Sequence, residues 1–210
     1  VLMGVKDHAT LARAADLGVA MQLTNICRDV GEDARAGRLY LPRDMMRAAG
    51  IDPDAFLHNP TPSAELTHVL KRVLAEAQRR YELADEGIRQ LPRSCRPGIL
   101  AARRLYAEIG QTVVKNGYDS ISRRAVVSRA RKGQILFGLA RGPAAAPELM
   151  AEPCAAENQF LLNAFPHTEE WQRPNQPRHF SANPAWMIEL FMVMKQRDEI
   201  AIQSQSNERK

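Results

Sequence analysis

The stretch QLTNICRDVGEDARAGRLYLP, residues 22–42, indicates the fold class of this chain, because it combines a helical pattern with a regular row of polar residues. Around it, from residue 10 to residue 34, alanine is abundant, proline is absent, and apolar residues recur three and four positions apart. This composition and spacing predict one long helix over 10–34. Gly37 and Pro42 then mark its end.

The rest of the chain predicts further helices and almost no strand. Apolar residues at helical spacing indicate helices over about 64–91, 97–116 and 122–140, with a short helix over 42–49. The proline-rich stretch 51–63 is expected to be a loop. The predicted fold class is therefore all-α, an antiparallel helical bundle built from long helices.

The character of the sequence changes at GPAAAP, residues 142–147. Residues 148–210 contain many prolines and few apolar repeats, apart from an amphipathic stretch around 186–195. We interpret 1–147 as the helical domain and 148–210 as a loosely ordered tail.

Composition and charge exclude several classes of protein. The 210 residues are 45% hydrophobic and 25% charged, as is typical of a globular domain. A net charge of +5 suits anionic ligands or an anionic membrane surface, but it is too small and dispersed to indicate a nucleic-acid partner. The three cysteines are far apart, which argues against a disulfide framework or zinc site and favours a reducing, cytoplasmic setting. No apolar run has the length of a membrane span, and no signal peptide is visible.

Four polar residues of the quoted stretch lie on one side of the predicted helix. At about 100° per residue, they fall within roughly 80° of one another. Apolar residues cover much of the remaining circumference, as in an interior helix, so we expect this polar stripe to face an internal cavity. The polar stripe consists of Gln22, Asn25, Asp29 and Asp33.

The two aspartates of the stripe are four residues apart, so their charges repel each other on a bare helix. A divalent cation reverses that effect, and oxygen ligands of this kind suit Mg²⁺, with Mn²⁺ as the alternative ion. Arg28, Arg35 and Arg38 lie close by in sequence, and guanidinium groups bind phosphate oxygens well. A solvated helix face with simple ion pairs explains the same spacing, so the residues alone leave both interpretations open.

The quoted stretch resembles the second aspartate-rich motif of the squalene and phytoene synthase family, in its bacterial phytoene synthase version. The resemblance covers about residues 1–140, and no counterpart in the family is recognised from about residue 148 onward. The segments that carry it are LGVAMQLTNICRDVGEDARAGRLYLP (17–42), AGIDP (49–53), YELADEGIRQLP (81–92), RPGILAARRLYAEIG (96–110) and RRAVVSRARK (123–132).

This resemblance implies an isoprenoid (prenyl) synthase type of helical domain, of which the chain would supply the C-terminal half. Members of the family bind two isoprenoid diphosphates with Mg²⁺ in a central cavity, between two aspartate-rich motifs. The phytoene synthases join two geranylgeranyl diphosphates head to head through a cyclopropyl intermediate, and they need no nicotinamide cofactor. The implied activity is therefore a prenyl transfer in carotenoid biosynthesis.

Carried over by position, Asp29 and Asp33 resemble the Mg²⁺ ligands of the motif. Tyr106 and Arg124 match family positions that contact the diphosphate or its metal cluster, and they are the implied catalytic residues. Such a reaction needs charge neutralisation on the leaving diphosphate and an apolar cavity that excludes water. The residues that resemble the diphosphate-binding positions are Gln22, Asn25, Arg28 and Arg38.

Two departures from the family pattern bear on activity. The first aspartate-rich motif is missing, and the chain starts without Met inside a helical pattern, so we expect it to begin within a larger protein. The N-terminal half would then be needed to complete the site, and the chain alone should bind Mg²⁺-diphosphate weakly and turn over poorly. Cys27 occupies a position where the family commonly has a small or aliphatic residue. Little effect is expected, since a buried thiol behaves as a small hydrophobe.

Several alternatives remain open at this point. An enzyme that makes presqualene diphosphate or dehydrosqualene from farnesyl diphosphate would carry the same motif. A non-catalytic relative acting as an assembly factor tends to lose the aspartates, which this chain retains, and a gene remnant is the third alternative. The basic clusters at 79–80, 103–104 and 129–132 are interpreted as surface charge that also suits anionic lipid, so peripheral association with the inner face of the membrane is expected.

Overall fold

The computed structural model describes residue 3 and residues 7–142 and 146–164. The chain divides into two units, Val1–Glu170 and Trp171–Lys210, and every described residue belongs to the first. The predicted amphipathic stretch at 186–195 therefore lies outside the described residues, as does most of the predicted tail.

Helix α1 (His8–Arg35) is the longest element and confirms the predicted long helix to within two residues at its start and one at its end. It begins where the Asp7 carboxylate accepts a hydrogen bond of 2.8 Å from the Thr10 amide, which satisfies a free donor of the first turn. It ends before Gly37, whose φ of +69° is the left-handed conformation that glycine adopts without strain.

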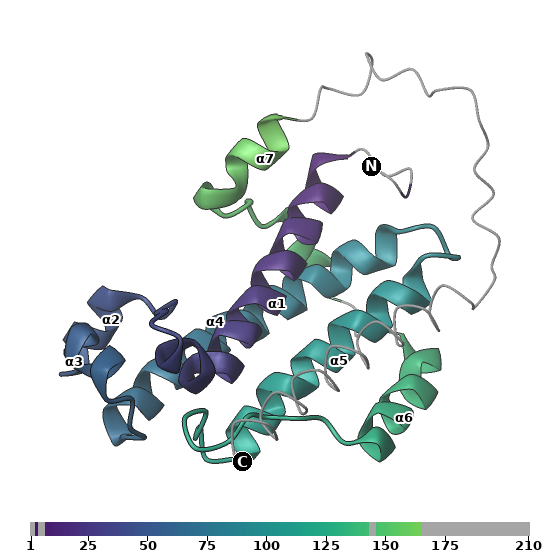
Figure 1. Cartoon of the computed structure of the whole chain (residues 1–210). Coiled ribbons are helices and arrows are strands. Elements are labelled where there is room, and N and C mark those ends of the chain that lie inside the picture. Colours follow the sequence, from purple (N-terminus) through teal and green to yellow (C-terminus); the bar gives the residue numbers. More distant parts are fainter. Residues whose placement is uncertain (1–2, 4–6, 143–145, 165–210) are drawn as a thin grey trace. The chain divides into compact units, whose positions relative to one another are not determined.

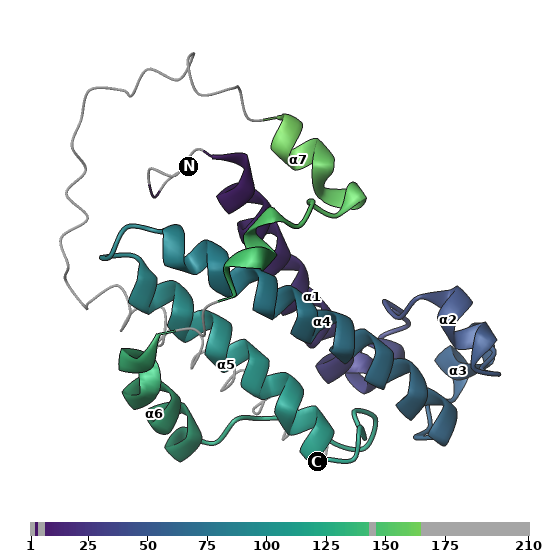
Figure 2. The same cartoon turned by 180° about the vertical axis from the view of Figure 1, so that it is seen from behind.

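Two further long helices run beside each other and pack against α1 (Figures 1 and 2). Helix α4 (Ala64–Gln90) starts at Ser63, whose hydroxyl accepts from the Leu66 amide, and stops before Pro92. Helix α5 (Arg96–Lys115) has Pro97 in its first turn, where a missing amide hydrogen costs nothing. All three long helices are therefore where the sequence predicts them.

The buried core lies mainly between α1 and α4. Its residues come from one face of each long helix and from the connection between them, and Tyr81 and Thr24 share a hydrogen bond of 3.0 Å inside it. Burial of these apolar side chains is the main force that holds the helices together. The largest cluster consists of Cys27, Val30, Ala34, Leu41, Met46, Phe56, Leu66, Val69, Leu70, Val73 and Ile121.

Two short helices cover one end of this core (Figure 1). Helix α2 (Arg43–Ala48) agrees with the prediction, but the expected loop over 51–63 was wrong in part because it contains α3 (Pro53–His58). The Asp52 carboxylate caps α3 by accepting from the Asp54 amide, and Pro53 sits at its first position. A proline there begins a helix rather than breaking one, and the buried Phe56 holds the helix on the core.

The predicted helix over 122–140 was wrong in its first third. Residues 122–128 are irregular, and α6 (Arg129–Phe137) begins only after Ser128, whose hydroxyl caps it, and continues into a 3-10 turn, η1 (Gly138–Arg141). Ala125 and Val127 are buried while Val126 is exposed. This alternation is that of an extended segment, and it was mistaken for a helical pattern.

After residue 146 the described chain consists of short helical turns: η2 (Pro147–Ala151), η3 (Ala156–Asn158) and α7 (Gln159–Asn163). Segment η2 packs against α1 and α4. The described residues contain helices and no strands, so the predicted all-α class is confirmed for this part of the chain. None of the described helices is long and apolar enough to span a membrane.

Candidate functional site

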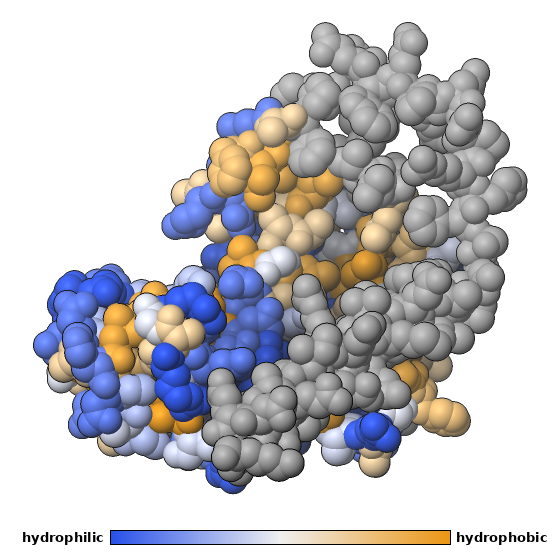
Figure 3. All heavy atoms as spheres, in the orientation of Figure 1, coloured by the Kyte–Doolittle hydropathy of each residue, from blue (hydrophilic) through white to orange (hydrophobic). Residues whose placement is uncertain are grey.

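The polar stripe lies on the side of α1 that points away from α4 and α5. Ala20, Thr24 and Cys27 face those helices and are fully buried, whereas the stripe residues fall on the opposite side of the same helix. Figure 3 shows hydrophilic residues gathered over the C-terminal end of α1, beside α2 and α3.

The described residues do not enclose the stripe, so the expectation that it faces an internal cavity stays a prediction. Gln22 is exposed, and the other three stripe residues are only half-buried. A cavity of about 200 Å³ lies on the other side of α1, where Thr24, Tyr81 and Gly110 contribute to its lining. Periodicity shows that a helix has several apolar faces, but it does not show which of them the rest of the chain covers.

Asp29 is the centre of the stripe and is held by two arginines. Arg28 donates from Nε to Oδ1 at 2.8 Å and from Nη2 to Oδ2 at 2.6 Å, the two-pronged geometry that suits a carboxylate. Arg124 donates from Nε to Oδ1 at 2.9 Å. Burial raises the pKa of the Asp29 carboxyl, but the hydrogen bonds and charges of Arg28 and Arg124 outweigh burial, so the pKa of Asp29 lies below its usual range.

Arg124 reaches the stripe because the irregular segment 120–127 lies against α1. The Gly31 amide donates to the Ser120 carbonyl at 3.0 Å, and a Cβ at residue 31 would come within 2.7 Å of the Ile121 Cα. Only glycine permits this approach. Arg35, also on α1, donates to the Ile121 carbonyl at 3.1 Å. This docking brings together Asp29 and Arg124, which are 95 residues apart in sequence.

Asp33 forms a separate and more open pair with Arg38. The Arg38 guanidinium donates to Asp33 Oδ1 at 3.1 and 3.3 Å, and its side chain is 53% exposed. The turn at Gly37 folds the chain back so that the Arg38 amide also donates to the Asp33 carbonyl, at 2.8 Å. Both sequence-predicted residues therefore lie at the C-terminal end of α1, beside the Asp29 ion pairs.

The remaining predicted site residues are placed differently. Tyr106, on α5, is half-buried against the cluster of Ala20, Ala77 and Tyr81, and no hydrogen bond joins it to a stripe residue within the described chain. Asn25 Oδ1 is buried without a hydrogen-bond partner among the described atoms. The structure thus brings Arg28, Asp29 and Arg124 into contact, but it does not connect Tyr106 with them.

Glu32 is a site residue that the sequence analysis missed. Its Oε2 lies 3.3 Å from Arg124 Nε, so Arg124 is shared between Asp29 and Glu32. Glu32 is three residues from Asp29 and so lies on the same side of the helix, which is a signal that the sequence carried. Gly31 was also missed, because its importance comes from a contact with a distant segment.

The stripe suits a hard divalent cation in the type of its donors, although it supplies only part of a coordination shell. Asp29 and Asp33 offer carboxylate oxygens, and the unpartnered Asn25 Oδ1 adds a neutral oxygen one turn earlier. Mg²⁺ commonly takes one or two protein carboxylates and completes its shell with water and substrate phosphates. Among the described residues no three His, Cys, Asp or Glu side chains converge as a complete metal site.

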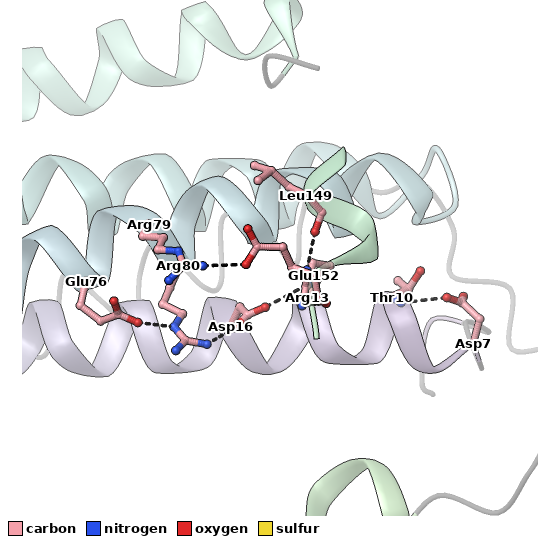
Figure 4. A network of polar contacts seen from close by, with 9 residues as sticks. All are labelled: Asp7, Thr10, Arg13, Asp16, Glu76, Arg79, Arg80, Leu149 and Glu152. Atoms are coloured by element: carbon pink, nitrogen blue, oxygen red, sulfur yellow. Dashed lines mark hydrogen bonds and ion pairs between the residues drawn. The ribbon is translucent and has the colours of Figure 1, made fainter. Parts of the chain in front are cut away.

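A second ionic cluster lies near the other end of α1, at its interface with α4 (Figure 4). Arg13 pairs with Asp16 at 3.0 Å, and both side chains are almost completely buried, at 0% and 1% exposed. Arg80 bridges Asp16 and Glu76, at 2.8 and 2.6 Å. We call the buried pair Arg13 and Asp16, together with Arg80 and the more exposed Glu76 at its solvent edge, the buried ionic cluster.

The buried ionic cluster also holds the segment that follows α6. The Arg13 guanidinium donates to the carbonyls of Leu149 and Glu152, and the Glu152 carboxylate accepts from Arg79 at 2.7 Å (Figure 4). The Arg13 guanidinium therefore pairs with Asp16 on its own helix and donates to the segment after α6, which indicates a structural role.

Comparison with known proteins identifies the family. The family described as squalene/phytoene synthase matches residues 1–131, which is more than half of the chain and contains the whole stripe. The chain belongs to the squalene/phytoene synthase family. Its similarity to a phytoene synthase from Rhodobacter capsulatus is 43% identity over 201 residues, covering 94% of this chain and 57% of that protein.

Other relatives agree with this assignment. A phytoene synthase from Cereibacter sphaeroides is 48% identical over 172 residues, covering 78% of this chain and 48% of the relative. A crystal structure of a dehydrosqualene synthase in complex with ligand is similar with a TM-score of 0.54 and 32% identity, over 61% of this chain and 45% of that one. The all-α fold is therefore that of the family.

These coverages also describe the extent of the chain. It spans about half the length of the curated relatives it matches. The alignment with the Rhodobacter capsulatus protein takes in 94% of the chain, so it extends into the stretch after residue 147. The domain boundary at residue 147 stays a prediction.

Proposed function

We propose that this chain contributes the second aspartate-rich part of a phytoene synthase site, which joins two geranylgeranyl diphosphates head to head to form phytoene. The observation that carries the proposal is the stripe on the open side of α1, where Arg28 and Arg124 meet Asp29 and where Asp33 and Arg38 follow one turn later. The similarity to phytoene synthases over the residues that contain the stripe supports the same activity.

The proposed roles follow from the charges of these side chains. Asp29, Asp33 and the Asn25 oxygen would hold Mg²⁺, or Mn²⁺ in its place, and the bound ion would neutralise charge on the leaving diphosphate. Arg28, Arg38 and Arg124 carry the positive charges that bind diphosphate oxygens. The Gln22 side-chain amide would form a hydrogen bond at the edge of the same diphosphate. No nicotinamide cofactor is needed for this reaction.

Tyr106 has a less direct place in the proposal. It lies on α5 against Ala20, so it is close to α1 but faces an apolar surrounding. We assign it to an apolar wall on the α5 side of α1, away from the stripe, where its hydroxyl would contact the carbocation that forms when the diphosphate leaves.

The open stripe agrees with the proposal that a further part of the enzyme completes the site. Half of the coordination shell would come from the N-terminal half, which carries the other aspartate-rich motif in the family. The 210-residue chain alone would therefore bind Mg²⁺-diphosphate weakly and turn over slowly. We also place the enzyme in the cytoplasm, at the inner face of the membrane that receives the apolar product, with the basic segment 129–132 as a lipid-facing candidate.

Two alternatives keep the same site. The similarity to a dehydrosqualene synthase supports a thirty-carbon enzyme that uses farnesyl diphosphate. The length of the substrate depends on the depth of a cavity that the described residues do not enclose, so they do not distinguish the two substrates. A non-catalytic assembly factor would keep the fold without the chemistry. The acidic residues Asp29 and Asp33 with their arginine partners argue against that alternative.

The test is a lipid-extract assay with Mg²⁺ and without nicotinamide cofactor. The chain is assayed alone and together with the part of the Rhodobacter capsulatus phytoene synthase that lies outside the alignment. Geranylgeranyl and farnesyl diphosphates are supplied separately. We expect a forty-carbon product from the complemented chain, and a much lower yield from the chain alone.

The Asp29→Asn variant should reduce that product by about 100-fold or more, since it removes charge at the reacting group. Asp44→Asn is the matched control, because Asp44 is an exposed aspartate of α2 outside the site. A thirty-carbon product would change the substrate and keep the mechanism. If a folded complex makes no product from either diphosphate, the proposed function is wrong.

A further inference from the structure

The Asp29 carboxylate is already engaged by protein donors. Arg28 and Arg124 together make three hydrogen bonds to it, at 2.6, 2.8 and 2.9 Å, and a carboxylate has about four lone-pair positions for such contacts. A hard cation needs those same oxygen positions. A metal ion therefore finds only about one open position on Asp29, and beside it the positive charges of Arg28 and Arg124, which oppose a cation until they move away. We call this arrangement the Asp29 latch (Arg28, Asp29, Arg124).

The arginines of the latch would also have to change partners before they bind an anion. A diphosphate is bound through the guanidinium donors of Arg28 and Arg124, and these donors now point at Asp29. Arg124 Nε is further shared with Glu32. The two expected ligands thus need opposite halves of the same ion pairs.

The latch is partly open to solvent, so exchange of partners is physically accessible. The side chains of Asp29 and Arg124 are 19% and 26% exposed, and Arg124 comes from the irregular segment between α5 and α6 rather than from a helix. An incoming ion can therefore reach the carboxylate, and Arg124 is not fixed by a helix.

We propose that the Asp29 latch couples the two ligands, so that a divalent cation and a diphosphate each bind more tightly in the presence of the other. The first ligand to bind competes with the ion pairs of the latch, whereas the second finds its partner groups no longer held by Asp29 or by Arg28 and Arg124. This coupling is reciprocal by thermodynamic necessity. It rests on the proposed function, because it takes the stripe to be a metal-diphosphate site.

The latch makes a prediction that a simple binding site does not make. Removing Arg124 should strengthen the binding of metal alone, because a competitor for the Asp29 oxygens is lost. Removing Asp29 should strengthen the binding of metal-free diphosphate, because Arg28 and Arg124 lose their hydrogen bonds to Asp29. In a site without a latch, Asp29→Asn would act on diphosphate only through long-range charge.

The first experiment measures Mn²⁺ binding to the full 210-residue chain by electron paramagnetic resonance, without any diphosphate. We expect Arg124→Gln to bind Mn²⁺ about fivefold more tightly than the unmodified chain. The matched control is Arg123→Gln, which removes the same charge one residue away. Arg123 donates to the Asn116 carbonyl instead of to the stripe, so its variant should change the affinity less than twofold.

The second experiment measures inorganic pyrophosphate binding by calorimetry in the presence of a chelator. Asp29→Asn should bind it about fivefold more tightly, and Asp44→Asn should leave the affinity unchanged. Thermal unfolding of each variant checks that it folds. Should Arg124→Gln fail to fold, Arg124→Lys keeps the charge but loses the Nε donor, and its Mn²⁺ affinity should still rise.

The outcomes separate the latch from the proposed function. Tight joint binding of Mn²⁺ and pyrophosphate, with equal effects of Arg124→Gln and Arg123→Gln, would overturn the latch and leave the site in place. Absence of joint binding by the folded chain, even at millimolar concentrations, would overturn both. Opposite shifts for metal and pyrophosphate in the two variants would establish the latch.

Discussion

The two ionic clusters of α1 use the same side-chain types under opposite conditions. Arg13 and Asp16, near the start of the helix, are almost completely buried and face α4. Asp29 and Arg124, near its end, are partly exposed and lie on the side that points away from α4. The first cluster has exchanged water for fixed protein partners and serves stability, whereas the second keeps access to solvent and is able to change partners.

Removing the buried arginine, Arg13, is the most direct test of the difference between the two clusters. We expect Arg13→Ala to lower the free energy of unfolding by about 3–5 kcal/mol, because it leaves a cavity and removes one of the two arginines that pair with the buried Asp16. Urea denaturation of the full chain measures this. A loss below about 1 kcal/mol would mean that water reaches Asp16, and that the two clusters are alike.

A chain that ends at residue 146 tests the same cluster from its other side. It lacks the carbonyls of Leu149 and Glu152, to which the Arg13 guanidinium donates, so we expect a loss of about 2 kcal/mol. A chain that ends at residue 164 is the control and should unfold near the full-length midpoint. Equal stability of the two shortened chains would instead support a domain that ends at 147.

Gly87 allows α1 and α4 to approach each other at the buried cluster. A Cβ at this position would collide with the Arg13 Cβ, so Gly87→Ala should cost about 1–2 kcal/mol. Gly18→Ala is the matched control, since it is also a helix glycine but a Cβ there meets nothing within 4 Å. Gly18→Ala should stabilise α1 by up to about 1 kcal/mol. The sign difference is read from thermal unfolding.

The partly exposed Asp29 latch should contribute far less to stability than the buried ionic cluster. Arg124→Gln is expected to lower the free energy of unfolding by less than about 1 kcal/mol, since partly solvated ion pairs gain little. High salt should shrink the difference further, whereas the effect of Arg13→Ala should persist. Arg123→Gln provides the charge-matched reference. An Arg124→Gln loss as large as that of Arg13→Ala would assign Arg124 to the scaffold.

The smallest effect concerns Cys27, on the buried side of α1 between the two clusters. Burial raises the pKa of the Cys27 thiol to about 12, so the reactive thiolate is scarce at pH 8. We expect iodoacetamide to leave Cys27 unmodified in the folded chain and to react first at the half-buried Cys95 and Cys154. Mass spectrometry after a timed reaction locates the label. Rapid labelling of Cys27 would show that α1 separates from the core.

Local signals predicted much of the fold. The three long helices were confirmed because their apolar spacing, alanine content and end signals such as Gly37 and Pro42 act within a few residues. Helix α3 departs from the prediction because a proline-rich stretch indicates a loop, whereas Pro53 at the first position of a helix is favourable. Residues 122–128 depart from it because a short apolar run does not distinguish helix from extended chain.

The candidate site was predicted as a set of residues and not as an arrangement. Asp29, Asp33, Arg28 and Arg38 lie within one stretch, so helical geometry alone places them near one another. Their contact with Arg124 depends on the docking of 120–127 at Gly31, which no local pattern encodes. The buried pair of Arg13 and Asp16 was missed for the same reason, since its partners lie on α4 and after residue 146.

The sequence by itself therefore determined the helical class, the long helices, the family and the stripe. Each of these depends on residue type and on spacing along the chain, and the amino-acid sequence contains both. The tertiary structure alone decided which side of α1 is covered, which arginine meets Asp29, and which ion pair loses its water. Those outcomes depend on contacts between segments that are distant in sequence. Such contacts bury charged groups, and burial lowers the local dielectric constant and so strengthens the interaction between two charges.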